Sequence, residues 1–277
     1  MAKEFKTLVY RNEEIAKDIF DLKLSVPEDF NSVAGQFVMI GVNDSSKLLK
    51  RPISICECKD GILRLVFRIA GEGTKKLSLL KAGDEVTVLG PVGNGYPFKE
   101  GEDRKVLLLG GGIGIPPILG AEKALKNSAK VTSILGYRDE MVFLNADFER
   151  ESFLTSDSCG VSVEEYASLS ALERKNVQIK GNAVSVAKAL ELANLLDFSE
   201  YDIICACGPM PMLRAVKQLA AEKGIKAYIS LEERMACGIG ACLGCVCKTV
   251  KKDAHTNVNN ARVCKEGPVF LAEDVEI

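Results

Sequence analysis

The chain has 277 residues, of which 47% are hydrophobic, and its formal net charge is −2. This length is enough for two domains, or for two domains and a small appendage. No basic run stands out, which argues against nucleic acid or an anionic membrane surface as a partner. No apolar stretch approaches the roughly 18 residues that cross a bilayer, so we also expect no membrane insertion.

The cysteine and histidine contents narrow the chemistry further. The charged start MAKEFKTLVY is not a signal sequence. Ten cysteines without such a signal indicate a reducing, cytoplasmic setting and a metal or redox role. The chain has one histidine, His255, which excludes sites built from several histidines.

The N-terminal third is predicted to be all-β. Short runs with apolar alternation are separated by Gly, Asp, Asn and Pro, which is typical of a small antiparallel barrel or sandwich. The runs are residues 5–15, 19–27, 35–42, 51–59, 61–69 and 84–93. One helix is predicted to begin with Thr74 as its N-cap and to end before Gly83, with Leu77 and Leu80 on one face.

The middle of the chain alternates between strands and helices, which predicts an open, doubly wound parallel sheet. In residues 104–117 a buried strand is expected to run into glycines and then a helix, and in 201–213 a strand is again followed by a helix. Further strands are expected in 131–139 and 226–234, and a further helix in 182–196. Residues 151–180 are predicted to be a loop with a short helix. In the C-terminal segment, a short sheet is predicted at residues 245–250, 261–264 and 269–273.

Four cysteines form the most specific motif of the chain. Cys237, Cys242 and Cys245 stand in a C-x4-C-x2-C run and Cys264 follows later, which is the plant-type ferredoxin spacing for a 2Fe–2S cluster. The intervening glycines, Gly238, Gly240 and Gly244, let the backbone approach the sulfurs.

Other uses of these cysteines fit less well. A structural zinc site usually pairs its ligands as two C-x2-C knuckles, and a disulfide framework is unusual in a long chain without a signal. Cys247 is an alternative ligand to Cys245, but the x2 spacing favours Cys245. We expect Cys247 to be a small buried residue on the following strand.

Two motifs of the β region suit a phosphate. Arg51, Pro52, Ile53 and Ser54 lie at the start of a predicted strand, where the arginine offers a cationic fork and the serine a hydroxyl. The alternative is an edge-strand arginine in a surface ion pair. The 73–74 pair, Gly-Thr, opens the predicted helix and is either an anion site or a simple N-cap.

Two further motifs end strands of the parallel sheet. Residues 110–114, a glycine-rich run, follow a buried strand and precede Pro116 and Pro117 in the first turn of a helix. Glycines at this place let the phosphates of a dinucleotide approach, although the spacing is not G-x-G-x-x-G. Residues 207–209, Cys-Gly-Pro, end another strand at the same edge; the alternative for the cysteine is a buried small hydrophobe.

The motifs RPIS, GEGT, LGPVGNGY, GGGIGIPP, CGPMPML and ISLEERMACGIGACLGCVCK occur in this order over nearly the whole chain. Together they resemble the electron-transfer subunits of dihydroorotate dehydrogenase B, a branch of the ferredoxin–NADP reductase family. The resemblance implies an FAD-binding β-barrel in residues 1–100, an NAD-binding α/β domain in 101–226 and a 2Fe–2S module in 227–277.

The resemblance also implies roles for single residues. The expected FAD contacts are Arg51, Pro52, Ile53, Ser54, Arg68, Ile69, Ala70, Gly73 and Thr74. The residues expected to face NAD are Gly110, Gly111, Gly112, Cys207, Gly208 and Pro209. The acidic turn of the family reads here as residues 155–158, Thr-Ser-Asp-Ser, and the family's Lys-Gly pair, residues 180–181, comes much later, so we carry no residue over from this stretch.

The activity implied by the resemblance is electron transport in pyrimidine biosynthesis. Electrons would pass from the FMN of a partner catalytic subunit through the cluster and FAD to NAD, in a heterotetramer of two plus two chains. The chain would then be a flavin and iron–sulfur oxidoreductase subunit without a catalytic residue of its own for dihydroorotate oxidation. The alternatives are a subunit of another complex, such as a ferredoxin-dependent NADPH reductase or a hydrogenase, and a zinc-stabilised binding module.

The nicotinamide nucleotide is expected to be NAD rather than NADP. Arg138 and Asp139 follow the second strand of the parallel sheet. An arginine near the ribose accepts a 2′-phosphate, whereas the neighbouring aspartate repels that phosphate or neutralises the arginine. The family resemblance favours NAD.

Overall fold

The computed structural model describes residues 2–42, 49–98, 104–125, 130–252 and 257–277. Their contacts divide the chain into two compact units. The first unit comprises residues 1–96, 230–270 and 274–276, and the second comprises 97–229, 271–273 and 277. The first unit thus holds both the β region and the cysteine segment, and the predicted division into three domains stays a prediction. His255 lies outside the described residues.

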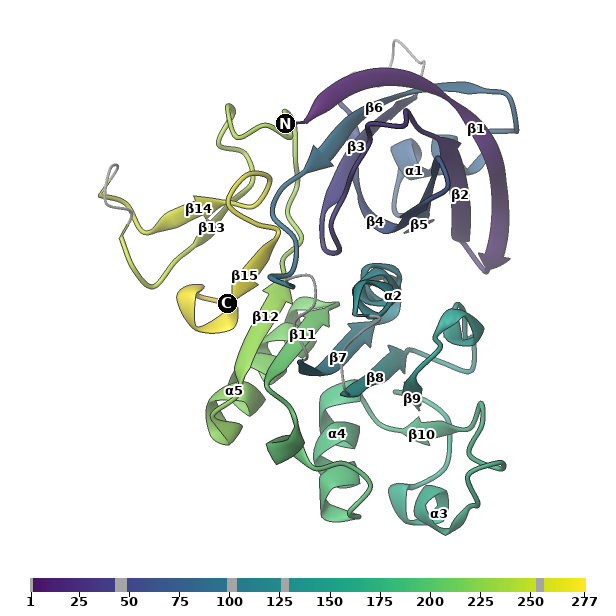
Figure 1. Cartoon of the computed structure of the whole chain (residues 1–277), viewed down its shortest axis with the longest axis vertical. Coiled ribbons are helices and arrows are strands. Elements are labelled where there is room, and N and C mark those ends of the chain that lie inside the picture. The colour runs from purple at the N-terminus through teal and green to yellow at the C-terminus, as the bar shows by residue number, and fades with distance from the viewer. Residues whose placement is uncertain (1, 43–48, 99–103, 126–129, 253–256) are drawn as a thin grey trace. The chain divides into compact units, whose positions relative to one another are not determined.

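The first unit contains a closed barrel of six strands in the order β1-β2-β5-β4-β3-β6 (Figure 1). All neighbouring strands are antiparallel. The strands are β1 (Lys3–Ala16), β2 (Ile19–Ser25), β3 (Phe37–Val42), β4 (Arg51–Lys59), β5 (Ile62–Arg68) and β6 (Glu85–Val92). Each of the six predicted strands is confirmed. Because β1 also pairs with β6, the architecture is a barrel and not a sandwich.

Helix α1 (Glu72–Ser78) packs its apolar face on the barrel core. Leu77 is fully buried in that core and Leu80 packs against it, as predicted. The predicted start of the helix was wrong, because the N-cap is Gly71. Thr74 stands in the first turn, where its hydroxyl accepts a hydrogen bond from the Ala70 N–H at 2.8 Å.

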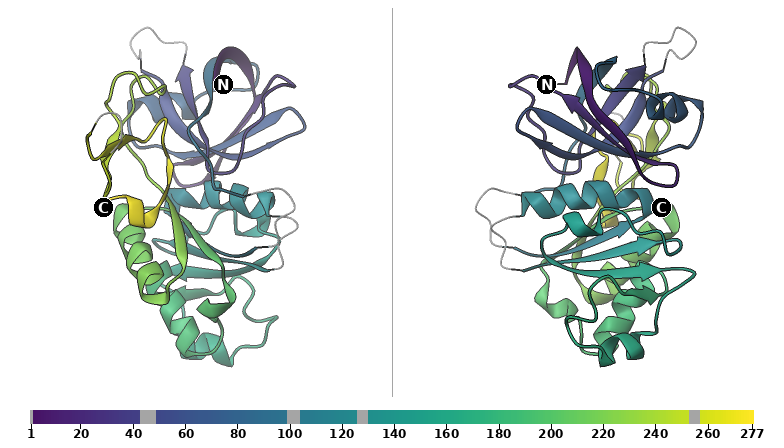
Figure 2. Two further views of the ribbon diagram at one scale, coloured as in Figure 1. Left: turned by 60° about the vertical axis from the view of Figure 1, so that its left-hand side comes forward. Right: turned by 90° about the vertical axis from the view of Figure 1, so that its right-hand side faces the viewer.

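The second unit is built on a parallel sheet with helices on both faces, as predicted. The strand order is β10-β9-β8-β7-β11-β12-β15, and the pairs from β10 to β11 are parallel. Helix α2 lies on one face, and α4 and α5 lie on the other (Figures 1 and 2). No helix in the described ranges is both long enough and apolar enough to cross a membrane.

The second unit and its sheet contain strands, helices and short 3-10 turns. The strands are β7 (Lys105–Gly111), β8 (Lys130–Tyr137), β9 (Glu151–Ser156), β10 (Gln178–Lys180), β11 (Ile203–Cys207), β12 (Lys226–Ser230) and β15 (Val269–Leu271). The helices are α2 (Ile115–Ala124), α3 (Val163–Ser168), α4 (Ala183–Leu192) and α5 (Met210–Lys223). Short 3-10 turns are η1 (Gly112–Gly114), η2 (Asn145–Asp147), η3 (Phe198–Glu200) and η4 (Ala272–Asp274).

The short helix predicted within residues 151–180 is confirmed as α3, but the rest of the segment is not a loop, since it forms the strands β9 and β10. Polar residues such as Thr155 and Ser156 are fully buried in β9, so the strand has no apolar alternation to reveal it. Helix α3 does carry a sequence signal. Ser162 accepts from the Glu165 N–H at 3.1 Å and the Glu165 carboxylate accepts from the Ser162 N–H at 2.9 Å, which is a capping box.

The cysteine segment forms one hairpin of β13 (Val246–Lys248) and β14 (Asn260–Arg262). The third strand predicted for this short sheet was wrong, because β15 belongs to the seven-stranded sheet instead. The Leu231 N–H donates to the Pro268 carbonyl at 2.8 Å. The chain before β15 therefore runs beside the segment that follows β12, which draws β15 away from the hairpin.

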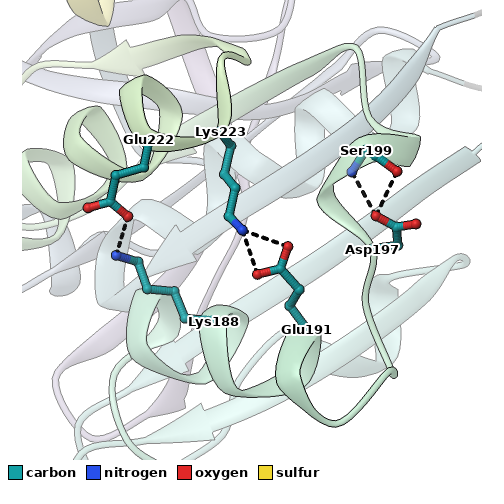
Figure 3. A network of polar contacts seen from close by, with 6 residues as sticks. All are labelled: Lys188, Glu191, Asp197, Ser199, Glu222 and Lys223. Atoms are coloured by element: carbon teal, nitrogen blue, oxygen red, sulfur yellow. Dashed lines mark hydrogen bonds and ion pairs between the residues drawn. The ribbon is translucent and has the colours of Figure 1, made fainter.

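Helices α4 and α5 are joined by two ion pairs at the surface of the second unit (Figure 3). Lys188 Nζ lies 2.6 Å from Glu222 Oε2, and Lys223 Nζ lies 2.7 Å from Glu191 Oε2. Exposed pairs of this kind contribute about 0–1 kcal/mol each. The buried residues of both helices, such as Leu190 and Val216, contribute more to holding them on the sheet.

The burial of α1 predicts a contrast between two leucines. Leu77 is fully buried and Leu79, at the end of the same helix, is 69% exposed. Leu77→Ala should lower the free energy of unfolding of the first unit by about 2–5 kcal/mol, because it leaves a cavity in the barrel core. Leu79→Ala should change it by about 0.5 kcal/mol or less. Denaturant titration followed by circular dichroism checks this, and equal losses would contradict the packing of α1.

Candidate cofactor sites

A cavity of about 740 Å³ lies in the first unit, between the start of β4 and the beginning of α1. Its size suits a cofactor or drug-sized ligand. The lining residues are Leu49, Lys50, Arg51, Pro52, Ala70, Gly71, Glu72, Gly73, Thr74, Glu232, Glu233, Arg234 and Met235. The cavity thus brings together Arg51, Pro52, Ala70, Gly73 and Thr74 from the predicted FAD contacts.

The Arg51 side chain is seated against Gly73. A Cβ added to Gly73 would stand 1.8 Å from Arg51 Nε, so only glycine leaves room for the guanidinium in this position. The guanidinium also donates to the Leu49 carbonyl. Because a fixed guanidinium binds phosphate oxygens through its fork of donors, the cavity fits a ligand with a phosphate group.

The other predicted FAD contacts do not line this cavity. Ile53 is buried in the barrel core, and Ser54 pairs with Phe37 of β3. Arg68 is exposed at the end of β5, and the Ile69 N–H donates to a backbone carbonyl in the β1–β2 turn. Their roles toward FAD stay predictions.

Four lining residues were missed by the sequence analysis. Residues 232–235, Glu-Glu-Arg-Met, directly follow β12 and line the cavity beside the start of β4. They belong to the same motif as the cysteine run, ISLEERMACG. Charged residues between a buried strand and a predicted metal loop are the signal that could have identified them.

The cysteine loop directs backbone donors at sulfur. Cys237 Sγ accepts from the N–H groups of Ile239 at 3.5 Å and Cys242 at 3.4 Å, and Cys242 Sγ accepts from the Gly244 N–H at 3.4 Å. Burial acts to raise the pKa of Cys237, but these hydrogen bonds outweigh it and lower the pKa to about 6. The hydrogen-bond donors therefore favour the thiolate of Cys237, the form that binds iron.

Two glycines give this loop its course. Gly238 and Gly240 have φ of 69° and 81°, in the left-handed region that glycine adopts without strain. A Cβ on Gly238 would also lie 2.6 Å from Met39 Cγ of β3. The loop can therefore pack against the barrel only with glycine at position 238.

The β13–β14 hairpin brings the fourth cysteine back to the loop. The Val263 N–H donates to the Cys245 carbonyl at 2.8 Å, which places Cys264 beside Cys245. Burial and the neighbouring Cys245 thiol raise the pKa of Cys264 to about 12. Such a thiol loses its proton only when a cation such as iron compensates the charge.

Cys247 lies on β13 opposite Ala261 and is half-buried, and burial raises the pKa of its thiol. Its position on a strand agrees with the prediction, whereas the predicted full burial was wrong. Across the described residues, no three His, Cys, Asp or Glu side chains gather around a point that would hold a single metal ion. Two observations support a cluster at the four cysteines. Backbone N–H groups donate to the sulfurs of the loop, and the hairpin register brings Cys264 beside Cys245.

The two glycine segments of the second unit meet at the carboxyl edge of the sheet. Gly110 of β7 pairs with Cys207 of β11. A Cβ on Gly114 would lie 2.2 Å from the Cys207 carbonyl oxygen, so the close approach of these two segments requires glycine. Ligands of open α/β sheets bind in the crevice at this edge. Within the described chain, the fully buried Thr155 hydroxyl has no hydrogen-bond partner.

Residues 155–158 and 180–181, which are far apart in this sequence, lie next to each other in the fold. Lys180 pairs with Ser156 across β10 and β9, and the Gly181 N–H donates to the Ser156 carbonyl at 2.8 Å. The intervening residues loop out through α3, and the two halves of the motif meet again at the strand ends. This edge of the sheet therefore keeps both halves side by side despite their separation in sequence.

Comparisons with known proteins show which proteins the chain is similar to. Residues 232–276 match the family model of the iron–sulfur cluster binding domain of dihydroorotate dehydrogenase B. The chain is 41% identical to the dihydroorotate dehydrogenase B (NAD(+)), electron transfer subunit of Fusobacterium nucleatum, with 97% of each chain covered. It is 35% identical to that of Caldanaerobacter subterraneus, with 98% of each covered.

Solved structures show the same fold. An NADH-dependent reduced ferredoxin-NADP oxidoreductase, described for flavin-based electron bifurcation, is 27% identical with a TM-score of 0.77, over 98% of this chain and 89% of that one. A ferredoxin NADP+ reductase from Neisseria gonorrhoeae with bound FAD and NADP is 16% identical with a TM-score of 0.65, over 84% and 95%. The second similarity concerns the fold alone.

The cysteine geometry predicts which thiols are indispensable. Cys237→Ser should abolish iron incorporation, because a neutral hydroxyl replaces a thiolate on the metal. Cys247→Ser should leave it largely intact. Iron and sulfide analysis of anaerobically purified protein measures both. Loss of iron in Cys247→Ser, together with normal iron in Cys245→Ser, would show that Cys247 and not Cys245 is a ligand.

The seat of Arg51 predicts a contrast between two glycines. Gly73→Ala should displace the guanidinium and weaken FAD binding about tenfold or more, as expected when a charged hydrogen bond is lost. Gly71→Ala is the matched control, since a Cβ at Gly71 meets nothing within 4 Å. Titration of apoprotein with FAD, followed by flavin fluorescence, measures both affinities. Equal affinities would exclude Arg51 as a phosphate ligand.

Proposed function

Because the chain belongs to the family of dihydroorotate dehydrogenase B electron-transfer subunits, we propose that it carries electrons from the FMN of a catalytic partner to NAD. This electron transport couples dihydroorotate oxidation to NAD reduction in pyrimidine biosynthesis. The observation that carries the proposal is the 41% identity over 97% of both chains. The cysteine loop and the glycine-bounded cavity support it independently.

Each cofactor has a place among the residues of this chain. The cavity with Arg51 and Gly73 would hold FAD, and the 110–114 and 207–209 segments would face NAD. Cys237, Cys242, Cys245 and Cys264 would hold the 2Fe–2S cluster. Bound FAD supplies the exchange between a hydride pair and the single electrons that an iron–sulfur cluster carries.

The chain's own groups would bind the cofactors and hold them in position. The Arg51 guanidinium binds phosphate oxygens and so fixes the position of the cofactor in the cavity. The N–H groups of Ile239 and Cys242 stabilise the charge on Cys237 Sγ, which is one of the interactions that tune a reduction potential. Glu122 is buried in α2 and binds the Arg150 N–H at 2.8 Å, which holds the start of β9.

The partner would dock at the cysteine loop. Ile239 and Leu243 are 57% and 62% exposed on either side of the exposed Cys242. Exposed apolar side chains beside a cluster ligand suit a protein interface, and one-electron transfer requires that the cluster come close to the partner's FMN. We propose two of these chains and two catalytic chains in a heterotetramer.

Dihydroorotate oxidation is assigned to the partner. The reaction removes a carbon-bound proton with a positioned base while a hydride passes to a flavin. The cysteine-rich loop is committed to iron, and His255 stands in a polar stretch between cluster ligands. None of the ten cysteines, all of which lie in the described residues, forms a disulfide. This suits a reducing compartment, and we accordingly propose a cytoplasmic location.

A ferredoxin-linked NADPH reductase subunit is the competing function. The structural similarity to the NADH-dependent ferredoxin-NADP oxidoreductase favours it, at 27% identity. The dihydroorotate dehydrogenase B subunits reach 33–41% over nearly the whole chain, which favours the proposed function. A zinc-stabilised binding module would be colourless, whereas flavin and 2Fe–2S absorption would exclude it.

The division of labour predicts a partner-dependent activity. The purified chain should reduce ferricyanide with NADH but form no orotate from dihydroorotate and an electron acceptor. Addition of the FMN-containing catalytic subunit should restore dihydroorotate-dependent NAD reduction. Leu243→Lys should weaken that restoration and leave ferricyanide reduction unchanged. Orotate formation by the chain alone, at an enzyme-like rate, would place the active site on this chain and contradict the proposal.

A further inference from the structure

We propose that Ser156 and Gln178 are positioning residues that hold the turn after β8 and thereby set the preference for NADH over NADPH. The turn comprises residues 138–143. The inference rests on the proposed NAD site at the carboxyl edge of the sheet. It concerns residues of β9 and β10, a part of the chain to which we carried over no role from the family resemblance.

Both side chains bind the same backbone oxygen. Ser156 Oγ donates to the Asp139 carbonyl at 3.1 Å, and Gln178 Nε2 donates to it at 3.0 Å. Ser156 is fully buried and Gln178 is half-buried. A carbonyl held by two side chains from two different strands has little freedom, so the centre of the turn is fixed to β9 and β10.

Further contacts close the network around Ser156. The N–H groups of Ser158 and Cys159 donate to Ser156 Oγ at 3.4 and 3.3 Å. The Cys159 thiol lies 3.1 Å from Ser156 Oγ and 3.3 Å from Gln178 Oε1, within reach of either acceptor. Removal of one member therefore leaves buried donors or acceptors without partners, which loosens the rest.

The two ends of the turn are held separately. The Tyr137 hydroxyl donates to the Phe143 carbonyl at 2.9 Å, and the Asp157 N–H donates to the Tyr137 carbonyl at 3.2 Å. The Asp139 carboxylate accepts from the Met141 N–H at 3.0 Å. The aspartate is thus oriented by its own turn, and the turn is oriented by Ser156 and Gln178.

The charges on this turn are the ones that distinguish the two nucleotides. NADP differs from NAD by a 2′-phosphate on the ribose, which arginines of such sheets accommodate. Arg138 and Glu140 are exposed on either side of Asp139, so the turn carries one attractive and two repulsive charges for that phosphate. Because charge interactions depend on distance, discrimination depends on how firmly the turn holds Asp139 in place.

The test compares specificity constants for NADH and NADPH with ferricyanide as acceptor. The wild type should prefer NADH. Gln178→Ala and Ser156→Ala should each reduce the NADH-to-NADPH selectivity about two- to tenfold, the range expected for one hydrogen bond. The change should appear in KM, with kcat within about twofold, because the turn contacts the ribose and not the reacting ring.

Two controls separate positioning from general damage. Gln218→Ala removes an exposed glutamine from α5 and should change nothing. Cys159→Ser keeps a hydroxyl donor in the network and should retain the wild-type selectivity. If Ser156→Ala fails to fold, Gln178→Ala decides the question, since its half-buried side chain ends at the surface-facing turn.

The outcomes distinguish this inference from the proposed function. Asp139→Asn tests the site itself, and it should reduce discrimination against NADPH. If Asp139→Asn changes selectivity while Gln178→Ala and Ser156→Ala leave it unchanged, the positioning role is overturned and the NAD site stands. If Asp139→Asn has no effect, or if the wild type prefers NADPH, both the site assignment and this inference are overturned.

Discussion

The candidate sites depend on one constraint, which is that the backbone approaches another group more closely than a Cβ allows. At Gly73 the group is the Arg51 guanidinium, at Gly238 it is the Met39 side chain, and at Gly114 it is the Cys207 carbonyl. In each case a β-carbon would overlap an atom already in place. The absence of a side chain therefore determines where a cation, a cysteine loop and a strand end are held, and these are the groups that a flavin phosphate, a cluster and a dinucleotide would meet.

The first unit contains both the cavity beside Arg51 and the cysteine loop, and hydrogen bonds tie its two segments together. The Asn94 N–H donates to the Gly267 carbonyl at 2.6 Å, and the Asn94 side chain donates to the Glu266 carbonyl at 2.9 Å. The end of β6 is thereby fastened to the segment that follows Cys264. Residues 232–235 line the cavity and lead directly into the loop. A cluster and a flavin in these places would share one compact body, which favours a constant distance for electron transfer.

In the second unit, the segment whose structure was hardest to predict from sequence lies beside the proposed nucleotide site. Residues 151–180 were expected to be a loop with a short helix, and they form that helix together with two strands that extend the sheet beside the proposed nucleotide crevice. In β9, hydroxyl-bearing side chains are buried at positions where a strand pattern would have apolar side chains. One of these hydroxyls, that of Ser156, binds the turn that carries the charges proposed to decide nucleotide choice.

The sequence by itself determined the elements that depend on local pattern. The six barrel strands, the parallel strands with their following helices and the cysteine spacing all rest on periodicity, glycines or ligand chemistry, and these are encoded within a few residues. Only the tertiary structure decided that β15 leaves the hairpin, that Glu232 and its neighbours line the cavity and that Ser156 meets Gln178 across two strands. These arrangements depend on contacts between segments far apart in the chain, and no local pattern records which distant backbone will satisfy a buried polar group.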